Sequence, residues 1–405
     1  MYKQTTLKKF VLPLLLILVS QSAILPTESN REDFSRFILH ISLIKTYPEA
    51  LSTKKGNKSA DWFIEKSKKG KPKDLERHIN NTFLEKASAL SQKFFPHGVK
   101  LAVDITKIPV YSKSKSKFIT HSNAEKGTTS FYQFLGFSIC ERQFKFPVSF
   151  HLMEKNDLSN LSELIHENLN QIIHKIKIKH IIMDRGFISS KIVKVLQNVE
   201  SSFIIAYRKS KKFNKLFLAL ENSKINKKDE FYFPAFKKII YRKNSKCWLI
   251  RDYTYGNPKV RVNLVIWKAK QSKSKKKKNS ILKNEYFLYI TSSDVDAESV
   301  YSLYGTRWRI ETAFRQIKDQ QAKTRVINPC HRIWLFGVAC LIYASWIYRH
   351  LPEDQDQIIP ENLITEELQK FYKTWMYKRI PVRILVEQYL EILEHYSLLF
   401  SERRD

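Results

Sequence analysis

The stretch YGTRWRIETAFRQIK, residues 304–318, places a single acid, Glu311, among tyrosine, arginine and lysine side chains. On a helix that turns about 100° per residue, Tyr304, Arg307, Glu311 and Lys318 fall within an arc of roughly 60°. They form a stripe about 21 Å long. The apolar side chains fall on a neighbouring face: Leu303, Ile310, Ala313, Phe314 and Ile317. The pattern therefore predicts a helix that buries one side and presents a carboxylate flanked by cations on another.

We expect this helix to run from about Ala297 to Lys323, with Asp294 or Asp296 as its N-terminal cap. A row of cations beside one acid can hold a phosphate chain next to a metal ligand. An exposed helix with ion pairs four residues apart gives the same pattern, so the helix alone does not decide between the two interpretations.

Two aspartates upstream follow or interrupt buried runs. Asp104 interrupts the strand-like run from Leu101 to Thr106, where a charge is costly unless it is paired or metal-bound. Asp184 follows the run 181–183 and precedes Gly186, which permits a sharp turn. The carboxyl ends of strands are where sites form in such sheets. Either aspartate alone could also be a turn or capping residue.

Together, Asp104, Asp184 and Glu311 are hard oxygen ligands that suit Mg²⁺ or Mn²⁺ rather than zinc. Two such ions, about 4 Å apart, can activate a water or a 3′-hydroxyl and stabilise the leaving oxygen in a displacement at phosphorus. Asp104, Asp184 and Glu311 are therefore candidates for the metal ligands and catalytic residues of a two-metal nuclease site.

The residues Tyr304, Arg307, Glu311 and Lys318 match Y-x2-R-x3-E-x6-K at every position. In this the chain resembles the DDE-type insertion-sequence transposases that move by cutting and pasting. The runs 184–187 (DRGF) and 289–292 (YITS) are similar to other motifs of that family, and the resemblance covers about residues 98–345.

The resemblance implies an α/β fold with an RNase H-like catalytic core, a mixed sheet flanked by helices, and a β-rich insertion between the second aspartate and the glutamate. It implies that the enzyme cleaves transposon ends and transfers strands into target DNA. Its partners would be the terminal inverted repeats, the target DNA and a second copy in a synaptic homodimer. The residues implied to bind DNA are Tyr304, Arg307, Lys318, Arg185 and Arg315. Trp248, Tyr255 and Trp267 are candidates for stacking on a flipped base.

Hydrophobic periodicity divides the chain into five predicted regions. Residues 1–95 form a helical DNA-binding region, in which 75, 79, 83, 87 and 90 are apolar at helical spacing, and 96–208 form the first part of the core. Residues 209–281 are the β-rich insertion, 282–348 complete the core with the signature helix, and 349–405 are helical.

Within the core we expect strands at 99–106, 131–140, 144–152, 179–183, 202–207 and 285–291, and helices at 158–176 and 189–199. In the insertion we expect strands at 248–255 and 260–267. A basic loop at 268–278 holds seven lysines among its eleven residues.

A net charge of +32, from 71 basic and 39 acidic residues, makes a polyanion the expected partner. Nucleic acid is favoured over an anionic membrane, and no membrane partner is expected. The four cysteines have no C-x-x-C spacing, so we expect reduced, mostly buried thiols and no zinc finger.

The N-terminus resembles a signal peptide, because Lys8 and Lys9 precede an apolar run from Phe10 to Val19. A buried first helix of a DNA-binding region fits the charge and motifs better, so we expect a cytoplasmic, nucleoid-associated protein. The apolar stretch from Ile333 to Tyr348 is short for a membrane span and is expected to be a core helix.

Three alternatives stay open on sequence alone. A relict transposase could bind transposon ends without cutting them, although all three acids are present. Another RNase H-like nuclease, such as a junction resolvase, would lack the signature stripe. A secreted or membrane-attached basic protein is indicated only by residues 8–23.

Overall fold

The computed structural model describes residues 27–349, except 44, 53–58, 113–115, 142–143, 222–229, 235, 270–285 and 293–294. The signal-like N-terminus, Asp294, most of the lysine tract and residues 350–405 therefore lie outside the described residues. The described residues fall into two compact units. The first draws on Met1–Pro96, Ile105–Leu158 and Glu311–Asp405, and the second on His97–Asp104 and Ser159–Ile310.

Helices open the first unit: α3 (Glu28–Leu43), α4 (Glu49–Ser52), α5 (Ala60–Ser67) and α6 (Pro72–Phe94). Helix α6 begins with a proline, whose fixed φ suits the first helical turn and whose missing N–H is not needed there. Its predicted apolar positions Leu75, Ile79, Phe83, Ala87 and Leu90 are all buried. The predicted helical character of the described part of 1–95 is confirmed.

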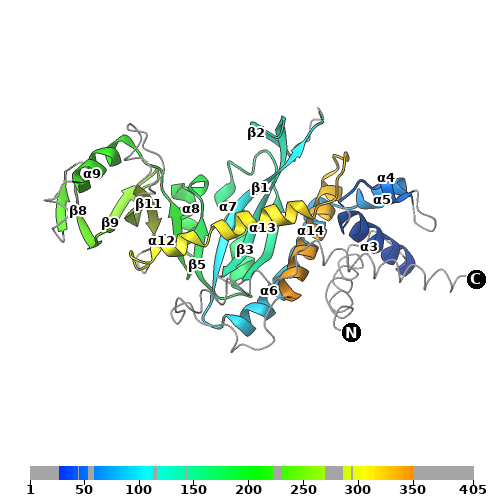
Figure 1. The fold of residues 1–405 in the computed structure, drawn as a ribbon, viewed down its shortest axis with the longest axis horizontal. Coiled ribbons are helices and arrows are strands. Elements are labelled where there is room, and N and C mark those ends of the chain that lie inside the picture. Colours follow the sequence, from blue (N-terminus) through cyan, green and yellow to red (C-terminus); the bar gives the residue numbers. More distant parts are fainter. Residues whose placement is uncertain are drawn as a thin grey trace, which may run out of the picture. The chain divides into compact units, whose positions relative to one another are not determined.

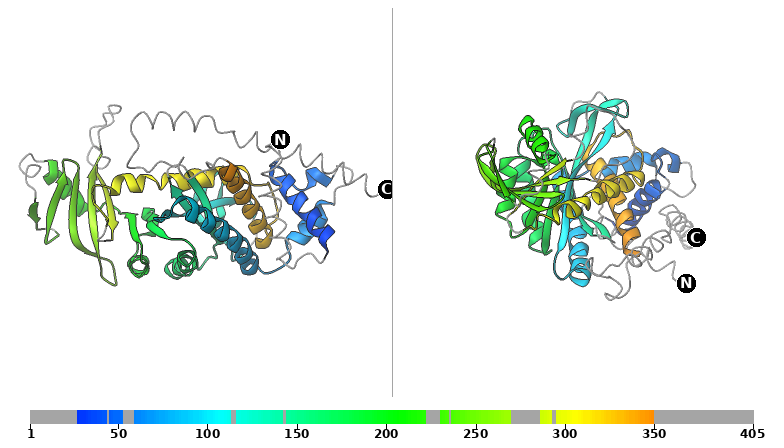
Figure 2. Two further views of the ribbon diagram at one scale, coloured as in Figure 1. Left: turned by 90° about the horizontal axis from the view of Figure 1, so that it is seen from below. Right: turned by 60° about the vertical axis from the view of Figure 1, so that its left-hand side comes forward.

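Helix α14 (Pro329–Arg349) packs on α3, α6 and strand β4 (Phe144–Leu152) within the first unit (Figure 2). Among the described helices it alone is long and apolar enough to cross a membrane, and its residues 330–347 are all buried. The ring of Phe336 stacks on Phe134 at 4.1 Å and meets Phe150 edge-on at 5.1 Å. Such aromatic pairs add about 0.5–1.5 kcal/mol beyond area burial. The prediction of a buried core helix is confirmed.

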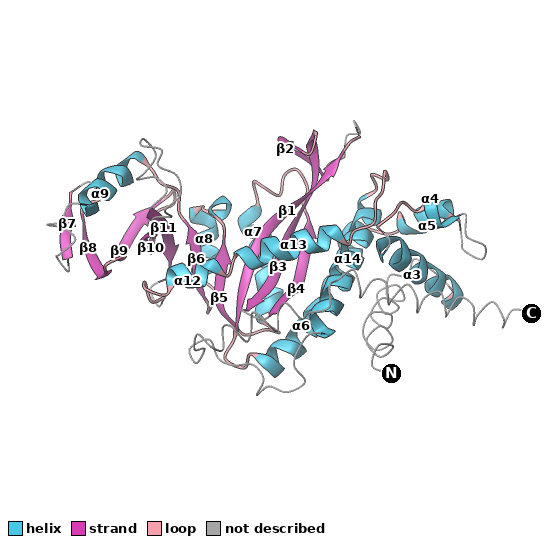
Figure 3. Cartoon of the chain, viewed as in Figure 1, coloured by secondary structure: helices cyan, strands magenta, loops and turns pink. Residues whose placement is uncertain are grey.

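The strands of the first unit are β2 (Ile119–Glu125), β3 (Thr128–Glu141), β4 and the second half of β1 (Val99–Val110) (Figure 3). Strand β3 pairs with β2 along its first residues and with β4 along the rest, both antiparallel. The bounds predicted for β4 are those observed. The sequence does not predict strand β2, because its residues ITHSNAE lack an apolar alternation and five of the seven lie outside the core.

In the second unit, the first half of β1 pairs in parallel with β5 (Ile178–Met183), which pairs in parallel with β6 (Ser202–Ala206). Strand β11 (Tyr286–Thr291) joins β6 antiparallel. Helices α7 (Leu161–Ile173) and α8 (Ser190–Gln197) pack on each other, and α8 also packs on β6. The predicted order of strand, helix, strand, helix, strand is therefore confirmed here, and the sheet is mixed as expected.

Beyond β11 the sheet continues antiparallel through β10 (Val260–Lys268), β9 (Cys247–Tyr255), β8 (Lys238–Asn244) and β7 (Glu230–Phe233) (Figure 1). The β-rich character predicted for 209–281 is confirmed, and β9 and β10 match their predicted ranges within one residue. Helix α9 (Lys211–Glu221), β7 and β8 are not predicted by the sequence. Helix α9 adds to this layer, since its Phe217 stacks on Tyr286 at 4.5 Å with the rings 1° apart.

The predicted continuous helix from Ala297 to Lys323 is wrong. The segment forms two helices, α12 (Val300–Gly305) and α13 (Trp308–Asp319), with a turn between them. The turn is tighter than an α-helix, because its hydrogen bonds join residues three apart. The amide of Arg307 donates to the carbonyl of Tyr304, and the amide of Ile310 donates to the carbonyl of Arg307. Asp296 caps the preceding turn, because its carboxylate accepts from the amide and hydroxyl of Ser299 at 3.0 and 2.7 Å.

Candidate active site

Parallel pairing of β1 with β5 places two of the predicted catalytic acids at neighbouring strand positions. The last paired positions are Val103 and Met183; Asp104 is the next residue of β1, and Asp184 directly follows β5. The paired residues before them are buried, whereas both aspartates are only half-buried. The structure therefore brings Asp104 and Asp184 together at one point of the second unit.

The backbone turns immediately after Asp184. A short 3₁₀ helix, Arg185–Phe187, begins there, and the amide of Phe187 donates to the carbonyl of Asp184 at 3.0 Å. Gly186 is not among the residues with positive φ, so the turn does not depend on the conformational freedom that the sequence analysis assigned to it. Phe187 is buried and Arg185 is exposed beside the acid.

The signature residue Tyr304 meets the second aspartate. Its hydroxyl donates a hydrogen bond of 3.2 Å to Oδ1 of Asp184. Its ring packs against Tyr289 of β11 at 4.8 Å. Burial raises the pKa of the Tyr304 phenol above its usual range. The charge and hydrogen bond of Arg307 lower it, and the negative charge and hydrogen bond of Asp184 raise it, so the pKa stays above its usual value. The phenol is therefore protonated at neutral pH and serves as a donor to the carboxylate.

Arg307 supports this tyrosine from the turn between α12 and α13. Its guanidinium lies 5.4 Å from the centre of the Tyr304 ring and 5.2 Å from that of Trp308. Arg307 is 5% exposed, whereas Trp308 is 62% exposed. The cation is therefore packed against the Tyr304 ring, where cation–π attraction helps to hold the phenol toward Asp184.

Helix α13 carries the remaining signature residues. Glu311 lies in its first turn and is half-buried, Arg315 is exposed one turn later, and Lys318 is half-buried a further turn on. The apolar face predicted for this helix is confirmed, because Ile310, Ala313, Phe314 and Ile317 are buried. Phe314 packs so closely on Gly136 of β3 that a Cβ atom at Gly136 would collide with its ring.

The predicted site residues thus divide between the two units. Asp104, Asp184, Tyr304 and Arg307 belong to the second unit, and Glu311 belongs to the first together with Arg315 and Lys318. Within residues 27–349, as far as they are described, three or more Asp, Glu, His or Cys side chains do not gather into a group suited to a metal ion. The four cysteines are buried thiols, as predicted.

The three aromatic residues proposed from sequence as base-stacking partners differ in accessibility. Trp248 is 1% exposed and lies in the core, so the structure removes it from the candidates. Tyr255 is half-buried, and its hydroxyl donates to the carbonyl of Ser189 at 3.1 Å. Trp267 stacks on Tyr301 at 5.1 Å, and Tyr301 is 39% exposed. Sequence alone missed Tyr301, since nothing marks it as the neighbour of a residue 34 positions earlier.

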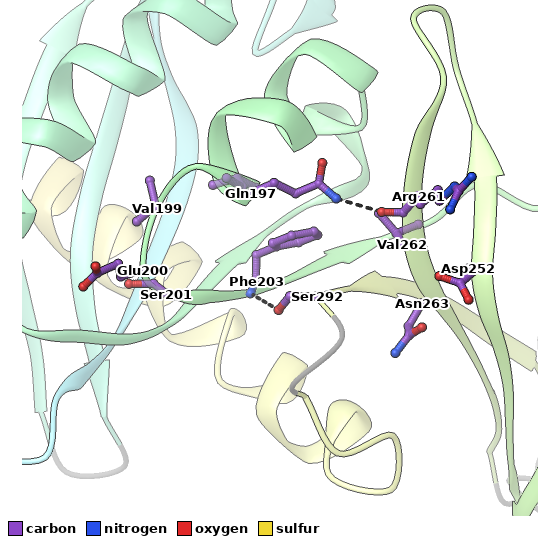
Figure 4. Close-up of a pocket in the computed structure, with 11 residues that line it drawn as sticks. Gln197, Val199, Glu200, Ser201, Phe203, Asp252, Arg261, Val262, Asn263 and Ser292 are labelled. Atoms are coloured by element: carbon purple, nitrogen blue, oxygen red, sulfur yellow. Dashed lines mark hydrogen bonds between the residues drawn. The ribbon is translucent and has the colours of Figure 1, made fainter.

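A pocket of about 510 Å³ lies in the second unit between α8, β6, β9 and β10 (Figure 4). Its lining includes Gln197, Glu200, Asp252, Arg261 and Asn263. The amide of Gln197 bridges the pocket wall by donating to the carbonyl of Arg261 at 2.7 Å. Asp104, Asp184 and Tyr304 do not line this pocket, so it is separate from the predicted catalytic acids.

Comparison with known proteins agrees with the predicted class. Residues 96–329 match the family model of the transposase DDE domain. The chain belongs to this family, which makes it a DNA transposase, an enzyme that cleaves and joins DNA with divalent metal ions. Both the resemblance and the function that it implied are confirmed.

The fold is similar to that of a solved piggyBac transposase synaptic complex with hairpin DNA. The TM-score is 0.51 and the identity is 11%, over 99% of this chain and 82% of that one. The mixed sheet flanked by helices is the RNase H-like fold expected of the catalytic core. A search of curated proteins finds no match.

Proposed function

We propose that Asp104, Asp184 and Glu311 are the catalytic carboxylates of this transposase and that they bind a pair of Mg²⁺ or Mn²⁺ ions. One observation carries the proposal: the Tyr304 hydroxyl donates to Asp184, so the signature segment meets the second aspartate. The register of β1 and β5 adds Asp104 to the same point. Glu311 lies seven residues after Tyr304, in the first turn of α13.

The donor set fits the proposed ions. All three side chains offer carboxylate oxygens, which Mg²⁺ and Mn²⁺ prefer, and no histidine or cysteine is part of the set. Tyr304 bonds one oxygen of Asp184, which fixes the orientation of the carboxylate and leaves its other oxygen for a ligand. When bound, the ions would supply an activated water or 3′-hydroxyl and stabilise the leaving oxygen.

We propose that three side chains hold the DNA backbone. Arg185 is exposed beside Asp184, and Arg315 and Lys318 follow Glu311 by one and two turns of α13. Arginine pairs with phosphate through two hydrogen bonds, and lysine does so as a point charge. Arg307 is packed over the Tyr304 ring, and we propose that it acts on DNA binding through Tyr304.

A stacking surface for an unpaired base is proposed at Trp267 and Tyr301. Their rings lie almost parallel, 6° apart, and Tyr301 presents an accessible face. Phe287, which is 38% exposed, meets Tyr301 at 5.8 Å and extends the surface. Lys209 lies 5.6 Å from the centre of the Phe287 ring and adds a cation. Aromatic faces with nearby cations are how proteins hold unstacked bases.

For the substrate we propose transposon ends held by a homodimer, followed by insertion into target DNA. The similar piggyBac structure is a synaptic complex with hairpin DNA, which supports synapsis of paired ends here. A net charge of +32 suits binding of long duplexes. Because its substrate is DNA, we propose that the enzyme works in the cytoplasm in association with the nucleoid.

The test is cleavage of the element's own terminal DNA with Mg²⁺ or Mn²⁺, comparing wild type, Glu311→Gln and Asp319→Asn. Asp319 is an exposed acid on the same helix and is the matched control. We expect wild type and Asp319→Asn to nick at the element boundary and Glu311→Gln to bind without nicking. Equal cleavage by all three would remove Glu311 from the site. Binding without cleavage by wild type would favour a relict DNA-binding protein.

A further inference from the structure

Lys107 extends from β1 across β3 to β2, within the first unit. Its Nζ passes 5.5 Å from the centre of the Phe131 ring of β3. It then donates to Ser122 Oγ at 3.1 Å and to Glu125 Oε1 at 2.8 Å. The Lys107 side chain is 31% exposed and that of Glu125 is 53% exposed. The pair therefore lies at the surface, where a large polyanion can reach it.

The hairpin that carries Glu125 is held in place by its own turn. Lys126 and Gly127 have φ of 52° and 78°, the tight two-residue turn that suits the twist of antiparallel strands. The Tyr111 hydroxyl donates to the carbonyl of Lys126 at 3.1 Å, and Thr128 donates to the carbonyl of Val110 at 2.7 Å. These bonds tie the end of β1 to the hairpin, so Glu125 is presented to Lys107 by a fixed scaffold.

The charges of three lysines act on the Glu125 carboxylate. The hydrogen bond from Lys107 lowers the pKa of the Glu125 carboxyl below its usual value. Burial opposes this effect, and the charges of Lys107, Lys318 and Lys126 lower the pKa further. Lys107 bonds this carboxylate, and the charges of Lys318 and Lys126 also act on it. Lys318 is the last residue of the signature and lies on the same helix as Glu311.

We propose that Lys107 binds the DNA backbone, and that in the DNA-free chain Glu125 holds the position beside Lys107 that a DNA phosphate takes on binding. A carboxylate and a phosphate offer the same kind of anionic oxygen to a lysine at the same distance. This proposal rests on the function proposed above, in which Lys318 also binds the DNA backbone. Lys107 lies three residues beyond Asp104 on β1, about 10 Å along the strand.

Because a DNA phosphate would replace Glu125 beside Lys107, Glu125 has two effects on DNA binding. It keeps the long Lys107 side chain extended, so less rotamer entropy is lost when DNA arrives. It also competes with phosphate, so DNA must displace a neighbouring anion before Lys107 can bind. Glu125 is therefore a competitor that weakens DNA binding, although it neutralises only one of the three lysines whose charges act on it.

The test is the affinity for a fluorescein-labelled, mixed-sequence DNA duplex, measured by anisotropy at several salt concentrations. Glu125→Gln, Lys107→Gln and the double variant are compared with Glu154→Gln and Lys117→Gln. Lys117 and Glu154 form the matched control pair, since they also bond at 2.8 Å in the first unit. Lys107→Arg keeps the charge and is expected to keep the affinity.

We expect Glu125→Gln to bind about threefold more tightly than Glu154→Gln, the size of effect of a surface ion pair. Lys107→Gln should reduce the slope of log affinity against log salt by about 0.9, one lost phosphate contact. In the double variant, the gain in DNA affinity caused by Glu125→Gln should disappear. Equal effects of Glu125→Gln and Glu154→Gln, or a gain that persists without Lys107, would overturn the proposal. If the Lys107–Glu125 proposal fails but wild type still nicks transposon ends, the proposed function stands. If wild type does not bind duplex DNA at all, both the Lys107–Glu125 proposal and the proposed function are overturned.

Discussion

The hydroxyl of Tyr304 lies 3.2 Å from Oδ1 of Asp184, and this hydrogen bond joins residues 120 positions apart in the sequence. Each residue belongs to a different motif, one at the end of a strand and the other in a short helix. The bond gives the tyrosine of the signature a physical meaning, because it orients an acid that the signature itself does not contain.

Tyr304→Phe removes this donor and leaves the ring in place. We expect the nicking rate to fall about tenfold, since a hydrogen bond to a charged group is worth about 1.5–3 kcal/mol. Binding of DNA should change less. The rate is measured against Mn²⁺ concentration, with Tyr232→Phe, an exposed tyrosine of β7, as the control. A Tyr304→Phe enzyme as fast as the control would show that the bond does not orient Asp184.

Gly136→Ala tests how closely α13 packs on β3. The added Cβ would collide with the Phe314 ring, and overpacking of this kind costs about 1–3 kcal/mol. We expect the free energy of unfolding to fall by that amount and nicking to weaken, because Glu311 lies one turn before Phe314. Urea denaturation measures the first effect. Gly305→Ala, which meets nothing within 4 Å, is the control, and adding Phe314→Leu should restore part of the loss. A Gly136→Ala chain with unchanged stability would contradict the packing.

His151 should make the stability depend on pH. Its Nδ1 lies 2.6 Å from Glu76 and its Nε2 lies 3.1 Å from Asp157. Burial lowers the pKa of the His151 imidazole, but the two carboxylates outweigh it and raise the value to about 9. The charged form is thus favoured in the folded chain. Its contribution, on the order of 3 kcal/mol, is fully present below pH 6.5 and is lost as the pH rises through 9.

Asp157 limits this contribution on the acid side. Its pKa is lowered despite burial, chiefly by the hydrogen bond with His151, so its contribution is lost as the pH falls through its folded value. We expect the difference in unfolding free energy between wild type and His151→Gln to shrink between pH 6.5 and 9. A difference that stays constant across that range would show that His151 is neutral in the folded chain.

Trp267→Ala tests the stacking surface. Stacking on an aromatic side chain is worth about 1–3 kcal/mol per base, so binding of end DNA with an unpaired terminal base should weaken about tenfold. Fully paired DNA should bind with little change. The measurement is the fluorescence of a 2-aminopurine at the unpaired position. Tyr232→Ala removes an exposed aromatic from β7 of the same layer and is the control. If Trp267→Ala weakened the binding of fully paired DNA as much as that of DNA with an unpaired terminal base, stacking on Trp267 would be contradicted.

Local residue patterns determined much of this protein. The match of Tyr304, Arg307, Glu311 and Lys318 to the signature indicated the family, and the buried runs before Asp104 and Asp184 predicted the strands that carry them. These predictions succeeded because strand burial and helix faces depend on side chains close together in the sequence. The sequence failed for β2, whose polar residues lack an alternation, and at Gly305–Arg307, where a tight turn interrupts an otherwise helical pattern.

The tertiary structure decided what long-range pairing alone can decide. The register of β1 and β5 sets Asp104 beside Asp184, and the packing of α12 brings Tyr304 to the same acid. In the folded chain Trp248 is buried, Tyr301 is exposed, and the Lys107 side chain reaches across β3 to Glu125. None of these follows from local propensity, because each depends on segments far apart in the chain that meet only when the sheet has formed. The sequence by itself thus determined which groups are proposed to perform the chemistry, and the folded chain determined which of them meet.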